Sequence, residues 1–208
     1  MERHVGRQPA PVSRPTALVT GTHGRTTVIR LLGAALAAGG RALAAGDLIE
    51  IDPETFPVAT APAAEIAVVT RASDDTGPPQ DSAESAWDQV RERRMAADWT
   101  ALRAEALVAL ARHSERVVLN ADDPLCRHGS KILDCPLTWF TLDPRNPLVI
   151  DHLGQGGDAC VLDDGLLCLC AGSTREVVVP ARELPLTLGG AARHQTANAL
   201  AALGAAVG

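Results

Sequence analysis

The sequence predicts an α/β fold with a mainly parallel sheet, flanking helices and an antiparallel hairpin extension. Two observations predict the parallel part. Short apolar runs recur up to residue 142, and runs without alternation are typical of strands buried on both faces. Helical patterns separate some of these runs. A third observation predicts the extension, because after residue 157 the apolar segments are joined by tight turns.

The first element expected is a strand at residues 16–20, followed by a helix from about Thr26. The glycine pair Gly39-Gly40 ends this helix. A turn-rich loop is expected at 74–85, and the helical spacing of Trp99, Leu102, Ala106 and Leu110 predicts a long helix after it. The other strands expected in the parallel sheet are 65–70, 116–119 and 137–142.

The last part of the chain predicts hairpins and then a helix. Asp164-Gly165 is a strong hairpin turn signal within the strand-like segment 158–180. The alanine-rich stretch 191–208 predicts the closing helix. Residues 1–14 are polar and proline-rich, as in a flexible tail, so one domain is expected over 15–208.

Composition excludes several partners. The net charge is −6, the basic residues are scattered, and aromatic residues make up 2% with no tyrosine, so neither nucleic acid nor a membrane is expected as a partner. No signal pattern or membrane-length apolar run is visible. The five cysteines lack CxxC spacing, which favours reduced, buried thiols and a cytoplasmic location.

The stretch VTGTHGRTT (19–27) has the features of a phosphate-binding loop. Gly21 and Gly24 allow a tight turn at the start of a helix, where backbone N–H groups and the helix dipole attract an anion. Arg25 would reach terminal phosphates in place of the usual lysine, and the hydroxyl of Thr26 or Thr27 would bind Mg²⁺. The alternative is an ordinary strand-to-helix turn.

Two further motifs follow in order, VVLNADDP (117–124) and LPLTLGGAARHQTANALAALG (184–204). Together with the loop they resemble the Mur ligase family, and within it the Mur-ligase-like ATP-binding region of cyanophycin synthetases. Segments 74–80 and 137–165 also look like parts of that family. The resemblance runs from about Leu18 to the end of the chain, with one gap. A P-loop kinase or GTPase fits the first motif only.

The resemblance implies a P-loop-type domain of an ADP-forming amide ligase that uses ATP and Mg²⁺ to join an acid to an amino acid or peptide. Thr26 would lie nearest the Mg²⁺, Asn198 would contact adenine, and Gln195 stands where the family has another asparagine. The residues implied in cofactor binding are Gly21, Thr22, His23, Gly24, Arg25, Thr26, Thr27, Asn120, His194, Gln195 and Asn198.

Plainer interpretations of the same residues remain open. Asn198 could satisfy a buried backbone group. Asn120, Asp122 and Asp123 could form a strand-end turn and cap the next helix. The Asp151-His152 pair resembles a family histidine motif but follows NADDP instead of preceding it, so we interpret it as a loop, with a displaced metal ligand as the alternative.

The departures from the family bear on activity. The family carries a glutamate and a histidine that organise Mg²⁺ before NADDP, and no counterpart of the acidic strand is visible here, so the domain looks internally shortened and no catalytic residue is assigned. The sequence also stops where the family's C-terminal ligase domain would begin. We therefore expect no appreciable ligase activity from this chain alone. Another ligase subunit could supply missing domains; the alternative is a truncated or degenerate nucleotide-binding relative.

Overall fold

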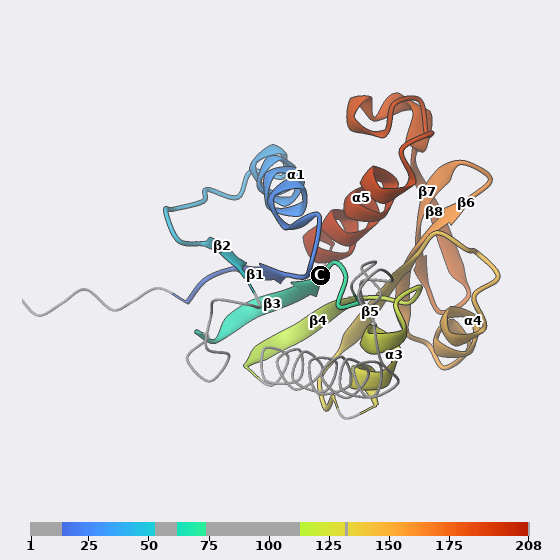
Figure 1. The fold of residues 1–208 in the computed structure, drawn as a ribbon, viewed down its shortest axis with the longest axis horizontal. Helices are drawn as coiled ribbons and strands as arrows, with labels where there is room; N and C mark the ends of the chain where they lie inside the picture. Colours follow the sequence, from blue (N-terminus) through green and yellow to red (C-terminus); the bar gives the residue numbers. More distant parts are fainter. Residues whose placement is uncertain (1–13, 53–61, 74–112, 132, 208) are drawn as a thin grey trace, which may run out of the picture.

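The computed structural model describes residues 14–52, 62–73, 113–131 and 133–207 (Figure 1). The strands in these ranges are β1 (Ala17–Thr20), β2 (Leu48–Ile51), β3 (Ala64–Val69), β4 (Ser114–Asn120), β5 (Leu137–Thr141), β6 (Asp158–Asp163), β7 (Leu166–Ala171) and β8 (Thr174–Pro180). The helices are α1 (Arg25–Ala38), α3 (Pro124–Ser130), α4 (Pro147–Gly154) and α5 (Arg193–Ala206), with short 3-10 helices at η2 (Ala181–Glu183) and η3 (Pro185–Thr187). The expected loop at 74–85 and the expected helix around Trp99 lie outside the described residues, and so do residues 1–13 of the expected tail.

The strands form one sheet in the order β2-β1-β3-β4-β5-β6-β7-β8. Strands β1 to β6 run parallel to one another, and β7 and β8 extend the sheet in antiparallel pairing. Asp164 and Gly165, at φ 48 and 74°, make the turn between β6 and β7, as expected of a two-residue hairpin. The predicted fold class is confirmed.

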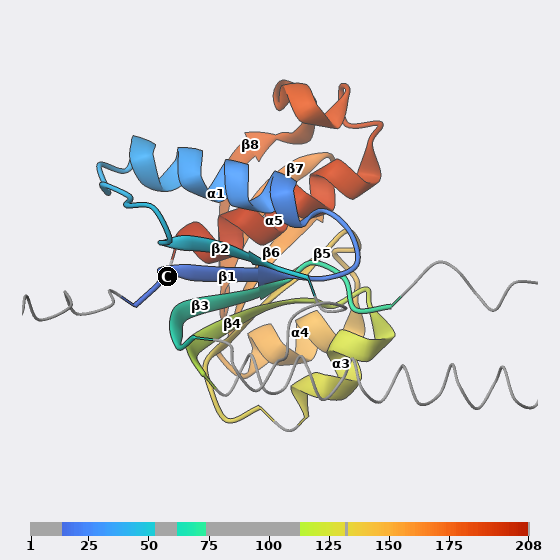
Figure 2. The same ribbon diagram turned by 60° about the vertical axis from the view of Figure 1, so that its left-hand side comes forward.

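Helices cover both faces of the sheet, and the alternation of side chains along each strand explains why. Ile66 and Val68 of β3 pack in the core that includes α1 and α5. Ala67 and Val69 point the opposite way, into the core that includes residues of α3 and α4. Figure 2 shows α1 and α5 on one side of the sheet and α3 and α4 on the other. Continuous apolar strands are therefore required in this sheet.

Strand β2 and helix α4 are elements that the sequence did not predict. Strand β2 has only four residues, and Glu50 interrupts its apolar residues, so no continuous apolar run reveals it. Residues 147–154 form helix α4, so the interpretation of Asp151-His152 as a loop was wrong. The Asn146 side chain accepts from the Leu148 N–H at 3.1 Å and Pro147 opens the helix, which is a start signal the sequence did contain.

All five cysteines are free thiols, and Cys168 and Cys170 share one sheet face. No helix in the described part of the chain combines the length and the apolarity that a membrane span needs.

Candidate functional site

Two neighbouring cavities lie at the carboxyl edge of the parallel strands, around the start of α1. Strand β2 lies on one side of β1 and β3 on the other, so the order in which strands are added to the sheet reverses between β1 and β3. Open α/β sheets bind ligands at such switch points. The larger cavity has a volume of about 540 Å³ and lies between α1, the ends of β3 and β4, and the start of α5. The smaller one, of about 210 Å³, lies between the loop 22–27 and β2.

Glycine is required at two positions of the loop between β1 and α1. Gly21 has φ 134°, and a Cβ there would come within 2.2 Å of the Thr70 hydroxyl oxygen. Gly24 has φ 84°, and its Cβ would come within 2.1 Å of Asn198 Oδ1. The Thr22 N–H also donates to the Arg71 carbonyl at 2.8 Å. The loop is thus pressed between the end of β3 and α5.

Two helix starts are directed to this edge without side-chain caps. Gly24 precedes α1 and Ala192 precedes α5, and neither residue has a side-chain hydrogen bond to its helix. The first N–H groups of a helix have no partner within it, and the helix dipole makes this end electropositive. The geometry favours an anion beside the loop.

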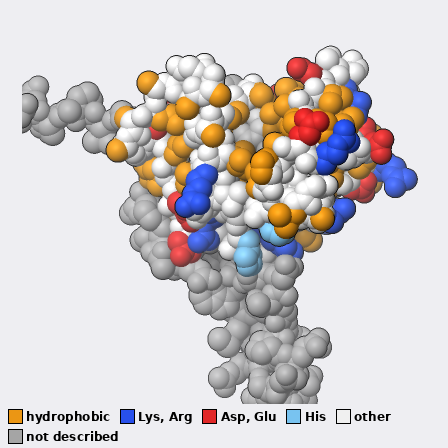
Figure 3. All heavy atoms as spheres, turned by 90° about the horizontal axis from the view of Figure 1, so that it is seen from above, with side chains coloured by type: hydrophobic (Ala, Val, Ile, Leu, Met, Phe, Trp, Pro, Cys, Tyr) orange, Lys and Arg blue, Asp and Glu red, His pale blue; other side chains and the backbone are white. Residues whose placement is uncertain are grey.

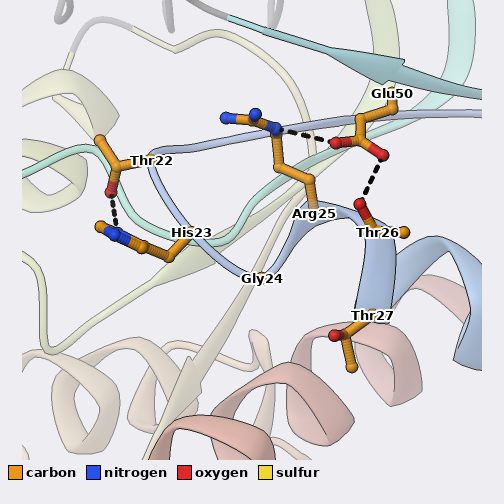
Figure 4. Close-up of a pocket in the computed structure, with 7 residues that line it drawn as sticks. All are labelled: Thr22, His23, Gly24, Arg25, Thr26, Thr27 and Glu50. Atoms are coloured by element: carbon orange, nitrogen blue, oxygen red, sulfur yellow. Dashed lines mark hydrogen bonds and ion pairs between the residues drawn. The ribbon is translucent and has the colours of Figure 1, made fainter.

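A carboxylate binds both side chains that the sequence assigned to phosphate and metal. Arg25 Nε donates to Glu50 Oε1 at 3.1 Å, and the Thr26 hydroxyl donates to Glu50 Oε2 at 2.9 Å (Figure 4). Arg25 Nη1 also donates to the Gly21 carbonyl. Sequence reasoning missed Glu50 because it missed β2; the available signal was the short run Ile49-Glu50-Ile51, in which apolar and charged residues alternate.

The start of α5 forms the opposite wall of the larger cavity. His194, Gln195 and Asn198 line it together with His23, Gly24 and Thr27 from the loop side. Figure 3, which looks down on the molecule from above, shows histidine side chains lying together near the middle of that view.

The Asn198 side chain lies at the contact between the two walls. Asn198 is 8% exposed, and its Nδ2 donates to Gln195 Oε1 at 3.1 Å. Its carboxamide thus contacts Gly24 and Gln195, and no hydrogen bond to a backbone group is seen among the described residues. Its contact with adenine stays a prediction.

The NADDP motif ties strand ends together. Asn120 Nδ2 donates to the Thr70 carbonyl at 3.0 Å, and Asn120 Oδ1 accepts from the Asp122 N–H at 2.9 Å. Asp123 caps α3, since its Oδ1 accepts from Leu125 N–H at 2.8 Å. This is the turn-and-cap arrangement named as an alternative, although Asn120 also lines the larger cavity.

Asp151 and His152 do not reach the loop. His152 Nε2 lies 3.1 Å from the carbonyl of Leu137, the first residue of β5, whereas the loop follows the last residue of the parallel strand β1. The two therefore lie at opposite edges of the sheet, which contradicts the displaced-ligand alternative. Within the described ranges, no three His, Cys, Asp or Glu side chains are grouped for a metal ion.

Comparison with known proteins agrees with these motifs. No protein-family model matches the chain. Over 85 residues it is 38% identical to cyanophycin synthetase from Synechocystis sp., which covers 41% of this chain and 10% of that protein. Over 101 residues it is 33% identical to cyanophycin synthetase from Crocosphaera subtropica, covering 48% of this chain and 12% of the relative. The chain thus spans about a tenth of the length of these curated relatives.

Solved structures share the fold over most of the chain. A pseudomurein peptide ligase type C from Methanothermus fervidus aligns with TM-score 0.53 and 16% identity, covering 95% of this chain and 47% of that one. UDP-N-acetylmuramoyl-L-alanyl-D-glutamate–2,6-diaminopimelate ligase aligns with TM-score 0.55 and 16% identity. The alignment covers 93% of this chain and 43% of that one. The chain is therefore a Mur-ligase-like α/β protein, alike in fold to peptide ligases and similar in part of its sequence to cyanophycin synthetase.

Proposed function

We propose that this chain is the ATP-binding domain of an ADP-forming, Mur-ligase-like amide ligase, and that Mg-ATP binds at the two cavities around the start of α1. One observation carries the proposal: Gly24 of the loop packs directly on Asn198 of α5, so the phosphate motif and the adenine motif form the two walls of one cavity. The partial similarity to cyanophycin synthetase supports the ligase class.

The chain's own groups have distinct tasks in this proposal. The backbone N–H groups at the start of α1 bind phosphate oxygens, with Arg25 adding charge. The amides of Gln195 and Asn198 hydrogen-bond the adenine edge. The hydroxyl and carboxylate oxygens that line the smaller cavity are donors of the kind that Mg²⁺ prefers, so the residues present fit this ion.

The reaction class follows from the proposed nucleotide. A substrate carboxylate attacks the γ-phosphorus of ATP and releases ADP, and an amine then attacks the acyl phosphate and releases inorganic phosphate. Mg²⁺, when bound, offsets the charge on the phosphates. The acceptor is an amino acid or peptide, and a further ligase subunit could hold it.

Calorimetric titration tests the nucleotide proposal. We expect Mg-ATP and ADP to bind in preference to GTP, because the two amides suit an adenine edge. Absence of binding heat at millimolar adenine nucleotide would refute the site, and equal affinity for GTP would refute only the adenine contact.

Variants at Arg25 test its phosphate contact in the same titrations. Arg25→Ala should weaken ATP binding by about 1–3 kcal/mol, the value of a charge-assisted hydrogen bond. Arg25→Lys should tighten it modestly, because an ammonium cannot bridge Glu50 and the Gly21 carbonyl as the guanidinium does. Arg30→Ala removes a charge from the exposed face of the same helix and serves as the control; loss of affinity equal to that of Arg25→Ala would contradict the direct contact.

A second candidate, a nucleotide-binding relative without catalysis, is favoured by the residue that follows β3. That residue is Thr70, whose hydroxyl donates to the His23 carbonyl. The described end of β3 therefore offers no carboxylate to a metal ion beside the loop, and Glu50 of β2 is the acid that contacts the loop. Acceptor-dependent ADP release by this chain tests the second candidate. We expect none from this chain alone, and turnover of about 1 s⁻¹, ordinary for enzymes, would exclude the second candidate.

A further inference from the structure

Glu50 is the carboxylate that lies against the phosphate loop. Strand β2 pairs in parallel with β1, and Glu50 lies opposite Val19. Val19 is one residue before the end of β1, where the loop begins. Glu50 is the one acidic residue among those that line the smaller cavity. Its side chain is 36% exposed, so it can exchange partners without a buried charge being stranded.

The two acids that line the larger cavity, Asp122 and Asp123, already accept hydrogen bonds from neighbouring segments. Asp123 Oδ2 accepts from the N–H groups of Ala72 and Ser73 at 2.7 and 2.9 Å, while its Oδ1 caps α3. Asp122 accepts from the Thr141 hydroxyl at 2.6 Å and the Leu142 N–H at 2.8 Å. Recruiting either acid to a cation would break contacts that hold strand ends together, whereas Glu50 holds only side chains in the bonds seen.

We propose that Glu50 and Thr26 together bind the Mg²⁺ that accompanies the nucleotide; this rests on the proposed nucleotide site. Thr26 Oγ1 and Glu50 Oε2 are 2.9 Å apart. Adjacent ligands of octahedral Mg²⁺, each at about 2.0–2.1 Å, are separated by about 2.9 Å, so both oxygens can coordinate one ion without moving apart. Water and phosphate oxygens complete the shell, as is usual for Mg²⁺.

Metal binding at Glu50 also releases Arg25. Without a cation, the carboxylate holds the guanidinium and places a negative charge beside the phosphates. With Mg²⁺ the carboxylate is neutralised, and Arg25, then held only by the Gly21 carbonyl, can turn to the nucleotide. Removal of the carboxylate should therefore have opposite consequences in the two conditions: tighter binding of metal-free nucleotide, and loss of the gain in affinity that Mg²⁺ gives.

The test is calorimetric titration with ADP, in chelator and in millimolar Mg²⁺, for the parent, Glu50→Gln and Glu65→Gln. Glu65 is a matched control: it is similarly exposed and pairs with Arg41 at 2.8 Å, but it lies near the amino end of β3. The parent and Glu65→Gln should gain affinity with Mg²⁺, and Glu50→Gln should lose roughly tenfold or more of that gain. Mn²⁺ titration followed by electron paramagnetic resonance should show the same loss for the Mn²⁺–ADP complex.

The outcomes separate the two proposals. Glu50→Gln that keeps the full Mg²⁺ gain overturns the metal role, and equal tightening with and without Mg²⁺ identifies Glu50 as a restraint on Arg25 only, which also overturns it. A parent that binds no ADP in either condition overturns the nucleotide site itself, and the metal role with it.

Discussion

Replacing Gly24 with alanine tests whether the loop and α5 form one site. Two costs arise. An L-residue at φ 84° is strained by about 1–2 kcal/mol. The new Cβ would also lie 2.1 Å from Asn198 Oδ1 and 2.8 Å from its Cγ, so a buried side chain must shift, which adds about 1–3 kcal/mol. The free energy of unfolding should fall by about 2–5 kcal/mol in all.

Gly40 provides a matched control for that substitution. Gly40 has φ 83°, but a Cβ there meets no atom within 4 Å. Gly40→Ala should therefore cost only the backbone strain, about 1–2 kcal/mol in chemical denaturation. In an Asn198→Ala background, the cost of Gly24→Ala should fall toward that value. If Gly24→Ala costs no more than Gly40→Ala, the contact between loop and α5 is not what the structure indicates.

Three further substitutions test contacts that hold the sheet together, and a fourth tests a buried thiol. Arg116 donates to the Gly204 and Ala205 carbonyls at 3.1 and 2.6 Å, so Arg116→Ala should lower the free energy of unfolding by about 1–3 kcal/mol. Arg175→Ala, which breaks an exposed ion pair, should cost under about 1 kcal/mol in the same denaturant titration. Asp123→Ala should cost about 2 kcal/mol or more, since it removes a helix cap and leaves buried N–H groups unpaired; a change under half of that would contradict the role of Asp123. Burial raises the pKa of the Cys160 thiol from near 9 to about 12, so the unfolded chain loses this proton first and stability should fall from pH 9 toward 12, by at most about 1.4 kcal/mol per pH unit. The fall should be smaller in Cys160→Ala, and an identical slope would contradict the raised pKa.

Local patterns were enough to predict most of the elements. Continuous apolar runs revealed β1, β3, β4 and β5, because strands buried on both faces need apolar residues throughout. Asp164-Gly165 located the hairpin, because few residues adopt its positive φ angles.

The features that were missed depend on contacts distant in sequence. Strand β2 has four residues, and its local sequence does not show that it pairs with β1. Glu50 therefore could not be placed beside Arg25 from the sequence. The contact of Gly24 with Asn198 joins residues from the two ends of the described chain. The spacing of motifs could suggest that they share a site, but only packing of α5 on α1 brings them into contact.

The most direct test of the nucleotide site is a crystal structure grown with Mg²⁺ and a non-hydrolysable ATP analogue. The phosphates should lie at the start of α1 within hydrogen-bond distance of the N–H groups of the loop 22–27, with the adenine against Asn198 of α5. Two results at saturating concentration would contradict the account: an analogue bound elsewhere, or an analogue that leaves the larger cavity, lined by Gly24 and Asn198, empty.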